Sequence, residues 1–317
     1  MPDLQKYVQW IPSQTYIPIF FQPWWMDAVC DGKSWETKVW EENSGVLAAM
    51  PYLLRQRMGM RFIVMPQMTQ LAGAWVSPTA NPTTIADAIH QHLLSLRLSY
   101  YYQQFPLNSS IPILLASKGY TIAPRVTYRI EDCSDVQKII AKYNRNKQRQ
   151  LKKSATYMLR QDNISPQEFH CFHRSALASQ GKEISYSELF LEKLLAAVQQ
   201  HHQGTILTLY DNQSATPLLI AAALYVWDAD AVRYLIAAQH PDYQHCGLMA
   251  RLVTEGIQLA HQRQIAFDFE GSMIPGVAKH FAQFGAAPAT YYSVERYFNP
   301  LFCFCNSAYQ FLTRRKR

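Results

Sequence analysis

Two carboxylates, Asp268 and Glu270, stand one residue apart in the stretch FDFEGS and directly precede a glycine. Side chains alternate along a β-strand, so the two acids would share one face while Phe267 and Phe269 share the other. A pair placed in this way could accept a proton from a reacting amine, hold a metal ion, or make ordinary buried hydrogen bonds and ion pairs. The spacing permits a two-carboxylate site without requiring one.

The first of these chemistries, aminolysis of an ester or thioester, needs a neutral amine and therefore a group that accepts its proton. Glu270, Asp268 and His240 are the candidates. Glu270 lies nearest the carboxyl end of its strand, where sites form in open α/β sheets. The alternative is structural: Asp268 would cap the next turn, and Glu270 would pair with a neighbouring arginine or lysine.

Sequence patterns typical of other chemistries are absent or incomplete. Two carboxylates without further Asp, Asn or His at ligand spacing make a poor cation site, and neither HCFH (170–173) nor HH (201–202) has a second set of ligands. We therefore expect no metal. The chain also has no GxSxG turn, GxGxxG loop or Walker sequence, which argues against a serine hydrolase and against dinucleotide or ATP binding.

A basic segment lies in the middle of the chain. Residues 136–160 include eight basic side chains and no acidic one, and the sequence ends in RRKR. The pattern predicts one helix, with Ser134 as its N-cap and Asp135 in its first turn. One face of that helix would carry a row of five cations: Lys138, Lys142, Arg145, Arg149 and Lys152. Such a row is either a solvated surface or a contact for a phosphate-bearing partner.

The composition indicates a folded protein with more than one core. With 317 residues, 49% of them hydrophobic, the chain is expected to form two domains. Six cysteines without paired CxxC spacing favour reduced thiols and a cytoplasmic location. No apolar run approaches the roughly 18 residues that span a bilayer, and the N-terminus lacks a signal-peptide pattern.

The order of the predicted elements repeats. Residues 36–66 and 205–241 each contain three strand-like runs joined by short turns, and each segment ends at a proline. A helix (83–98 and 246–264), a strand, a short helix that runs into a glycine, and a closing strand follow each meander. We therefore predict an α/β (α+β) fold of two duplicated domains, each with a mixed, largely antiparallel sheet flanked by helices. Two unrelated α/β domains are the alternative.

The repeat sets the expected boundaries. The first domain would span 1–130, a basic linking helix 131–155, and the second domain 156–298. Residues 299–317 form an aromatic stretch with a basic end. This segment would dock on the first domain or, alternatively, rest on an anionic membrane surface, which would make the protein membrane-peripheral.

Four stretches give the sequence a resemblance to FemA/FemB/FemX-type (FemAB-like) members of the GNAT acyltransferase superfamily: YNRNKQRQLKKSA, LIAAALYVWDADAVRYLIAAQHPDY, RQIAFDFEGS and GVAKHFAQFGAA. They are similar, in that order, to the family's basic helix, its central hairpin with the following loop, its strand with an acidic end, and its next helix. The resemblance covers about residues 35–300 and includes the duplication. It implies transfer of an acyl or aminoacyl group to an amine.

The resemblance also implies a donor that carries phosphates, either acyl-CoA or aminoacyl-tRNA. A loop at a helix N-terminus would hold the CoA pyrophosphate. The residues of that loop are Gln244, His245, Cys246, Gly247 and Leu248. Met249 stands where the family has a small residue, and Phe281 stands where many GNAT enzymes have a proton-donating tyrosine. The corresponding stretch of the first half, NPTTIADA, has no glycine, so only the second half is expected to be active.

The leading expectation is an N-acyltransferase that uses acyl-CoA, acts on a small-molecule or peptide amine, and has Glu270 and Asp268 as catalytic residues. The second is an aminoacyl-tRNA-dependent peptidyltransferase acting on a cell-wall or peptide precursor, with tRNA bound by the basic helix. A non-catalytic binding protein that retains the fold is the third, because Met249 and Phe281 depart from the family pattern. The residues expected to contact substrate or nucleic acid are Arg145, Arg149, Lys152, Tyr225 and Tyr234.

Overall fold

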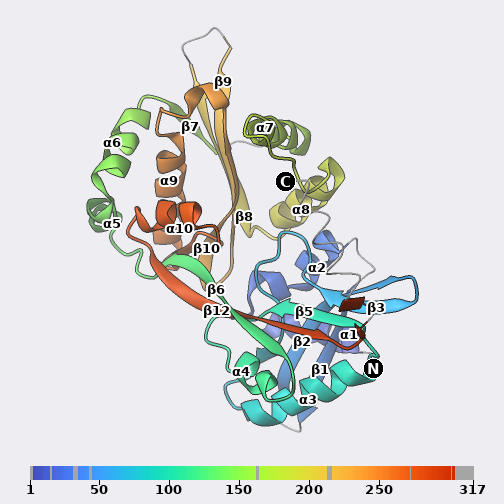
Figure 1. Cartoon of the computed structure of the whole chain (residues 1–317). Coiled ribbons are helices and arrows are strands. Elements are labelled where there is room, and N and C mark those ends of the chain that lie inside the picture. Colours follow the sequence, from blue (N-terminus) through green and yellow to red (C-terminus); the bar gives the residue numbers. More distant parts are fainter. Residues whose placement is uncertain are drawn as a thin grey trace. The chain divides into compact units, whose positions relative to one another are not determined.

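The structure, a computed structural model, describes residues 3–14, 16–30, 35–42, 45–161, 164–212, 216–271, 273–300 and 302–303. The chain divides into two compact units (Figure 1). Unit 1 comprises residues 1–14, 20–125 and 290–317, and unit 2 comprises residues 15–19 and 126–289. The chain therefore passes from unit 1 to unit 2 within strand β6 (Thr121–Ile130) and returns within strand β12 (Ala287–Tyr297).

Unit 1 is built on a sheet of mixed strand direction. Its strands pair in the order β1 (Trp35–Glu42), β2 (Gly45–Arg57), β3 (Met60–Val64), β5 (Tyr100–Gln104) and β12. The first three form an antiparallel meander, and the short strand β4 (Trp75–Val76) adds to β2. β3 and β5 run parallel because helix α3 (Pro82–Ser95) connects them. The other helices of the first half are α1 (Asp3–Trp10), η1 (Ile11–Ser13), η2 (Ile19–Phe21), α2 (Pro23–Val29) and α4 (Ile111–Ala116).

Helix α3 shows how the sequence specifies this unit. Ile85, Ile89 and Leu93 recur at helical spacing and are fully or almost fully buried against the sheet. Asn81 begins the helix, because its side-chain oxygen accepts a hydrogen bond from the backbone N–H of Thr83 at 2.9 Å. Cap and apolar stripe together fix where α3 starts and which face it turns to the core.

Unit 2 repeats the same arrangement. Its strands pair in the order β7 (Met158–Arg160), β8 (Gly204–Asp211), β9 (Leu218–Trp227), β10 (Ala231–Gln239), β11 (Ala266–Asp268) and β6. Only β10 and β11 are parallel, and helix α9 (Leu248–Arg263) connects them. The other helices are α5 (Val136–Lys142), α6 (Arg145–Ser154), α7 (Pro166–Ala178), α8 (Glu188–Gln200), η3 (Pro241–Tyr243) and α10 (Pro275–Ala282). In Figure 1, α5, α6, α9 and α10 lie on one face of this sheet, and α7 and α8 lie on the other.

The predicted duplication is confirmed, with one exchange that the sequence does not reveal. Each unit contains an antiparallel meander, a crossover helix and a parallel strand. The closing strands, however, pair in the opposite units: β6 from the first half pairs with β11, and β12 from the second half pairs with β5. The structural boundaries at 125/126 and 289/290 therefore fall inside these strands and differ from the expected ones at 130 and 298.

The basic segment forms two helices, so the prediction of one continuous helix is wrong. α5 ends at Lys142, Tyr143 is extended, and α6 begins at Arg145. Asn144 caps α6 by accepting the N–H of Lys147 at 2.8 Å, and an asparagine favours this capping position over a helix interior. The N-cap of α5 is likewise Asp135 rather than the predicted Ser134.

The C-terminal segment lies mostly outside the described residues, and so does its basic end. Within the described part, Phe302 stacks on Tyr100 of β5 with ring centroids 5.3 Å apart. None of the helices that the structure describes is both long enough and apolar enough to cross a membrane.

Candidate functional site

The strand that carries the two predicted acids ends earlier than its sequence pattern indicates. β11 covers only Ala266–Asp268, and Glu270 has a left-handed backbone with a φ of 62°. The two phenylalanines and the two acids still separate as expected: Phe267 and Phe269 pack on each other with ring centroids 4.9 Å apart, whereas the negative charge of Asp268 acts on Glu270 beside Arg233. The turn forms because Asp268 Oδ1 accepts the backbone N–H of Glu270 at 2.8 Å.

Asp268 is 2% exposed and is held by several donors. The hydroxyl group of Thr127 and the Nη1 of Arg129, both on β6, donate to its two oxygens. Burial raises the pKa of Asp268, while the guanidinium of Arg233 and these donors oppose the increase. With its oxygens engaged in this way, Asp268 holds its neighbours in place.

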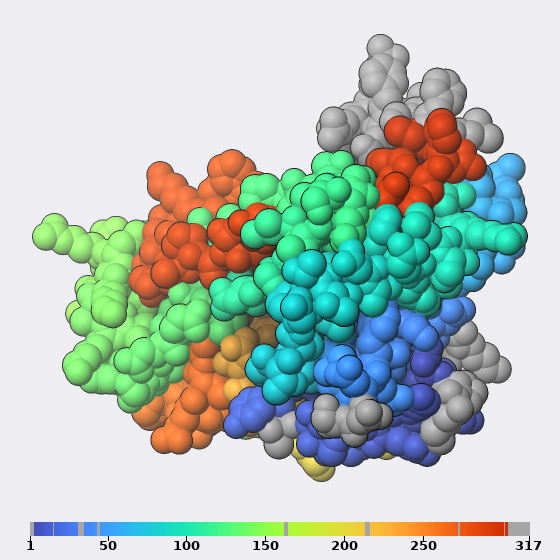
Figure 2. All heavy atoms as spheres, turned by 90° about the horizontal axis from the view of Figure 1, so that it is seen from below, coloured from blue at the N-terminus to red at the C-terminus, as the bar shows by residue number. Residues whose placement is uncertain are grey.

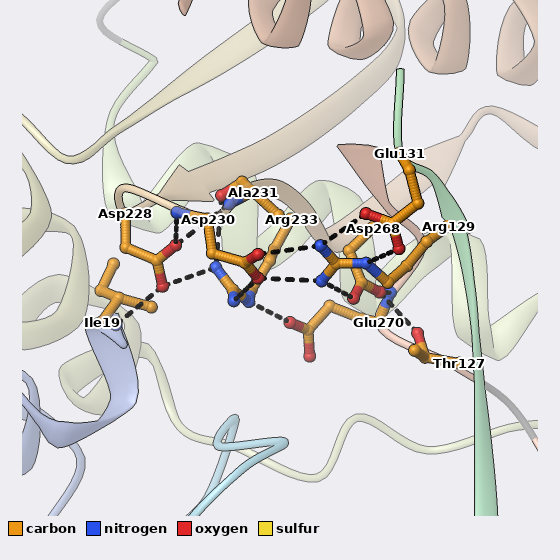
Figure 3. Close-up of polar contacts among 10 residues, drawn as sticks. All are labelled: Ile19, Thr127, Arg129, Glu131, Asp228, Asp230, Ala231, Arg233, Asp268 and Glu270. Atoms are coloured by element: carbon orange, nitrogen blue, oxygen red, sulfur yellow. Dashed lines mark hydrogen bonds and ion pairs between the residues drawn. The ribbon is translucent and has the colours of Figure 1, made fainter. Parts of the chain in front are cut away.

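Asp268 lies at the centre of a row across three adjacent strands. Strand pairing places it opposite Arg233 of β10 on one side and opposite Arg129 of β6 on the other. The two arginine side chains are only 1% and 4% exposed, respectively. Buried guanidinium groups need carboxylate partners, and Figure 3 shows the acids that surround these two.

Each arginine binds more than one acid. Arg129 binds Asp230 through two nitrogens at 2.9 and 3.0 Å, and its Nε donates to Glu131 at 2.8 Å. Arg233 donates to Asp228 at 2.7 Å and to Asp230 at 3.3 Å. Asp230 therefore joins the two arginines, and its bidentate contact with Arg129 restricts the geometry of the whole network.

Asp228 anchors the network to the turn between β9 and β10. Its carboxylate accepts the backbone N–H groups of Asp230 at 2.8 Å, Ala231 at 3.1 Å and Ile19 at 2.9 Å. Burial acts to raise the pKa of Asp228, but Arg233 and these donors lower it below its usual value. Asp228 is therefore ionised at neutral pH.

Glu270 has the longest ion pair of the network. Its side chain is 13% exposed, and its Oε1 lies 3.6 Å from the Nε of Arg233, beyond hydrogen-bond distance. Within the described residues Oε1 accepts no hydrogen bond. Burial and the negative charge of Asp268 raise the pKa of Glu270 to about 8, although Arg233 acts in the opposite direction. Glu270 can therefore gain or lose a proton near neutral pH.

The charge balance explains this raised pKa. Two guanidinium groups face five carboxylates: the exposed Glu131 and Asp230, and the buried or largely buried Asp228, Asp268 and Glu270. If all five were ionised, the negative charges would outnumber the two positive ones, and water reaches only Glu131 and Asp230 freely. A proton on Glu270 removes one buried negative charge, and Glu270 loses least on protonation because its ion pair with Arg233, at 3.6 Å, is the longest.

β10 and β11 separate directly after this row. Their pairing ends at Arg233 and Asp268, whereas β10 continues to Gln239 with a register shift between Tyr234 and Ile236. The hydroxyl group of Tyr234 is buried and has no hydrogen-bond partner within the described residues. Because Tyr234 directly follows Arg233, its side chain points to the opposite face of the sheet. The structure does not bring this predicted contact residue to the acids.

Tyr225, the other tyrosine predicted to contact a substrate, is fully buried. Its hydroxyl group donates to the carbonyl of Leu252 in α9 at 2.7 Å. Burial raises its pKa well above the usual value. Its visible role is to hold α9 against the sheet.

The predicted cofactor loop, residues 244–248, leads into α9 and is covered by α6. Gly247 has a φ of 79°, and a side-chain Cβ at this position would lie 2.1 Å from the backbone oxygen of Gln150. Lys153 donates to the carbonyl of His245 at 2.7 Å. Met249 packs against the core of unit 2. The glycine is therefore needed for the close approach of α6, whatever else the loop binds.

The cations of α6 divide between surface and interior. Arg145, Arg149 and Lys152 are exposed, as a nucleic-acid contact would require. Lys147 is 3% exposed, and its Nζ lies 3.1 Å from His280 Nδ1 and 4.9 Å from the ring centroid of Phe284. Burial lowers the pKa of Lys147 to about 8.

Two further residues singled out in the sequence have local structural roles. Phe281 is 9% exposed and packs on Phe269, with ring centroids 4.6 Å apart. His240 caps η3, because its Nδ1 accepts the N–H of Asp242 at 3.3 Å. Neither side chain joins the acidic network in Figure 3.

Sequence reasoning missed most of the network. The sequence does not single out Arg129, Arg233, Asp228 or Asp230 as site residues. One signal was present: Arg233 is the single charged residue in the apolar strand AVRYLIAAQ. A charge in the middle of a buried strand needs a partner, and the acids of the preceding turn and of FDFEGS were the available ones. No group of acidic, histidine or cysteine side chains among the described residues could hold a metal ion.

Sequence comparisons identify no relative: no protein-family model and no curated protein matches the chain. Structural comparisons do. The structure is similar to that of FemX, with a TM-score of 0.71 at 8% identity, over 95% of this chain and 97% of that one. It is also similar to L-PGS from Bacillus licheniformis, with a TM-score of 0.56 at 13% identity, over 96% and 95% of the two chains.

A third similar structure is a tandem GNAT protein from the clavulanic acid biosynthesis pathway. It has a TM-score of 0.51 at 12% identity and covers 84% of this chain and 85% of that one. These likenesses confirm the predicted fold, and the structural match to FemX and other GNAT-fold proteins supports the resemblance found in the sequence. The two units are tandem GNAT-like domains.

Proposed function

We propose that the protein transfers an acyl group to an amine and that Glu270 accepts the proton of that amine. The observation that carries this proposal is the raised pKa of a buried carboxyl group with only one long ion pair, located where β10 and β11 separate. A general base works best when its pKa lies near the working pH. The fold shared with FemX supports the reaction class.

The proposed reaction balances with Glu270 alone as the proton carrier. The amine nitrogen forms a bond to the acyl carbon while its proton passes to the Glu270 carboxylate. The bond from that carbon to the leaving oxygen or sulfur then breaks, and the protonated Glu270 returns the proton to the leaving group. Phe281 cannot donate a proton, so a second use of Glu270 accounts for the protonation of the leaving group.

The rest of the network would position and tune this base. Arg233 holds the Glu270 carboxylate through the 3.6 Å ion pair, and Asp268 raises its pKa by its nearby negative charge. Asp268 also fixes the backbone of Glu270 through the 2.8 Å hydrogen bond. In this proposal Asp268 is a positioning residue, and Glu270 is the catalytic one.

The proposal includes a donor that carries phosphate groups. α9 begins at Gly247 without a side-chain cap, so N–H groups of its first turn remain for an anion. α6, which packs on this loop, presents Arg145, Arg149 and Lys152 to solvent. Arg145, Arg149 and Lys152 provide more exposed positive charges than one pyrophosphate group would bind. This surplus supports aminoacyl-tRNA as the donor. The uncapped helix start alone supports acyl-CoA, which is the second candidate.

Substitution of the proposed base tests the reaction. Glu270→Gln removes the proton acceptor while nearly preserving shape, and loss of a general base typically lowers the rate about 10²- to 10⁴-fold. The assay is release of free thiol or of deacylated tRNA with a panel of acyl-CoA and aminoacyl-tRNA donors and amine acceptors. Glu183→Gln, an exposed glutamate of the same unit, is the matched control and should keep full activity. A rate unchanged by Glu270→Gln would remove Glu270 from the mechanism.

The donor is tested separately from the base. Changing Arg145, Arg149 and Lys152 together to Glu should weaken tRNA binding and reduce the slope of log K against log salt by about 2 to 3, since each phosphate contact contributes about 0.7–0.9. The same change at the exposed Arg55, Arg57 and Lys182 is the control. If the Arg145, Arg149 and Lys152 variant binds tRNA as tightly as the unaltered protein, these cations do not hold a tRNA donor, and the reason to prefer tRNA over acyl-CoA is lost.

A further inference from the structure

Unit 1 contains a cavity of about 590 Å³ that the proposed reaction does not use. Its walls come from the end of α1 with Gln14, the end of β1, the start of β2, and β4 with Ser77. The side chains that give it chemical character are Trp10, Trp75, Glu41 and Glu42. In Figure 2 the N-terminal residues of this unit, coloured blue, lie at the surface.

The two tryptophans form an aromatic corner. The ring centroids of Trp10 and Trp75 lie 5.0 Å apart, and the ring planes meet at 60°. Both side chains are partly exposed although they line the cavity. Both tilted indole rings line the same volume, and the face of tryptophan attracts a cation more strongly than that of tyrosine or phenylalanine.

The acids beside this corner leave one negative charge unmatched. Glu41 is paired with Lys6 at 2.6 Å, and the neighbouring Lys38 is paired with Asp3 at 2.9 Å. Glu42 is exposed and has no ion pair within the described residues. The cavity therefore combines an aromatic corner with the net charge of a single carboxylate, which suits a ligand group that carries one positive charge.

The walls of the cavity are fixed by backbone contacts. β1 and β2 shift register between Trp40 and Glu41, which leaves Leu47 of β2 without a partner residue on β1. The N–H of Ser77 donates to the carbonyl of Leu47 at 2.8 Å and so holds the segment after β4 against the hairpin. A β-bulge of this kind re-aims the side chains beside it. Glu41 and Glu42 follow directly after this shift.

We propose that this cavity of unit 1 binds an organic monocation with a substituted ammonium group. Its methyl or methylene groups would lie against Trp10 and Trp75, and its charge would face Glu42. The site is independent of the proposed acyl transfer, because none of its residues belongs to the network around Glu270. A compact inorganic cation lacks the apolar surface that the indole rings would cover, so the ligand class is organic.

The test uses choline and its neutral isostere, 3,3-dimethylbutan-1-ol, which has the same shape without the charge. Binding to the full-length protein is followed by tryptophan fluorescence and by the indole N–H signals in ¹⁵N NMR spectra. We expect saturable changes with choline and a dissociation constant at least about 10-fold higher for the alcohol. Equal affinity for choline and for the alcohol would overturn the proposal. So would the absence of a saturable change at the highest choline concentration at which the protein stays in solution.

Three variants assign the binding to this cavity. Glu42→Gln and Trp10→Leu should each weaken choline binding by about 5- to 30-fold, and Trp10→Phe should weaken it less because a phenyl ring retains part of the attraction. The matched controls are Glu183→Gln and Trp24→Phe, which lie outside the cavity. Circular dichroism and melting temperature establish that each variant is folded. Choline binding that survives both Glu42→Gln and Trp10→Leu would place the ligand elsewhere and contradict the proposal.

Discussion

The end of β11 in unit 2 and the end of β5 in unit 1 occupy equivalent places in the duplicated architecture, but their buried polar groups differ in kind. In unit 2 the row across β10, β11 and β6 is Arg233, Asp268 and Arg129. In unit 1 the row across β3, β5 and β12 is Ile63, Tyr101 and Arg296. Only the strand in unit 2 carries carboxylates, as the sequences FDFE and YYYQQ show.

The buried hydrogen bonds that extend from Tyr101 in unit 1 are neutral, and the Arg296 of this row donates to a backbone carbonyl, that of Lys118, at 2.7 Å. The hydroxyl group of Tyr101 donates to the side-chain oxygen of Gln103 at 3.0 Å, and the amide of Gln103 donates to the carbonyl of Pro51 at 3.3 Å. Each partner is satisfied without a charge. At this place in unit 1, buried hydrogen bonds between neutral groups connect the strands, whereas in unit 2 buried ion pairs do.

The crossover helices, α3 in unit 1 and α9 in unit 2, differ in how their N-termini are capped. Asn81 caps α3 with its own side chain, which accepts the N–H groups of Thr83 and Thr84. Gly247 starts α9 and offers no such cap. In unit 1 a side chain caps the helix start, whereas in unit 2 no side chain does. Both differences agree with the proposal that places the reaction in unit 2.

The largest effect on stability is expected from Arg233→Met. This change leaves Asp228, Asp268 and Glu270 with a buried negative charge that lacks a counterion, and breaking a buried pair in this way typically costs about 3–5 kcal/mol. The free energy of unfolding from urea titration measures it. Arg55→Met, at an exposed position of a strand in unit 1, should stay within about 0.5 kcal/mol of the unaltered protein. Similar effects for the two variants would mean that the charges of unit 2 are not coupled as described.

A smaller loss is expected from Gly247→Ala. The new Cβ would overlap the backbone oxygen of Gln150, and alanine tolerates the positive φ poorly, so the cost should be about 2–4 kcal/mol. Gly276→Ala is the matched control, because that glycine lies in α10 with open space around it and should be neutral or slightly stabilising. Thermal unfolding of both variants separates a packing role for Gly247 from a role in ligand binding alone.

The smallest loss is expected in the neutral network. Gln103→Leu removes one donor and one acceptor and leaves Tyr101 and the Pro51 carbonyl unsatisfied, which should cost about 1–3 kcal/mol. Urea titration gives the free energy of unfolding of this variant and of Arg233→Met, and so compares the neutral hydrogen bonds of unit 1 with the ion pairs of unit 2. A loss in unit 1 as large as that in unit 2 would contradict the view that charge distinguishes them.

Much of the fold could be predicted from the order of elements in the sequence, because strand and helix periods and glycine positions repeat in the two halves. The exchange of β6 and β12 could not, since either closing strand has a pattern that fits either sheet. Asn144 is a capping residue and signals the break before α6. The row of cations at helical spacing indicates one continuous helix instead, and this second pattern is misleading. Asp268 and Glu270 could be proposed as site residues from the local sequence FDFEGS alone.

The ion pairs around Asp268 and Glu270 could not be predicted from the local sequence. Arg129 and Asp268 are 139 residues apart in the chain and meet only because β6 crosses into unit 2. The left-handed turn at Glu270 depends on a hydrogen bond from its backbone to Asp268, which the strand pattern of the sequence conceals. Long-range strand pairing decides which charges meet, and one sequence alone does not reveal that pairing.

The central claim is that Glu270 is a buried carboxyl group that changes protonation near neutral pH. Its pKa is raised from an ordinary value of 4.5 to about 8 in the folded protein. The folded state therefore binds the proton more tightly than the unfolded state, and the stability this provides is complete below about pH 4.5 and is lost as the pH rises through about 8. Glu270→Gln mimics the protonated form at every pH and should not lose this contribution.

The most direct test is the difference in unfolding free energy between Glu270→Gln and the unaltered protein, measured by urea titration from pH 5 to pH 9. No substrate is needed. We predict that the difference shifts in favour of the variant as the pH rises, by at least about 2 kcal/mol over this range. A difference that stays constant from pH 5 to pH 9 would show that Glu270 does not titrate there and would contradict the account.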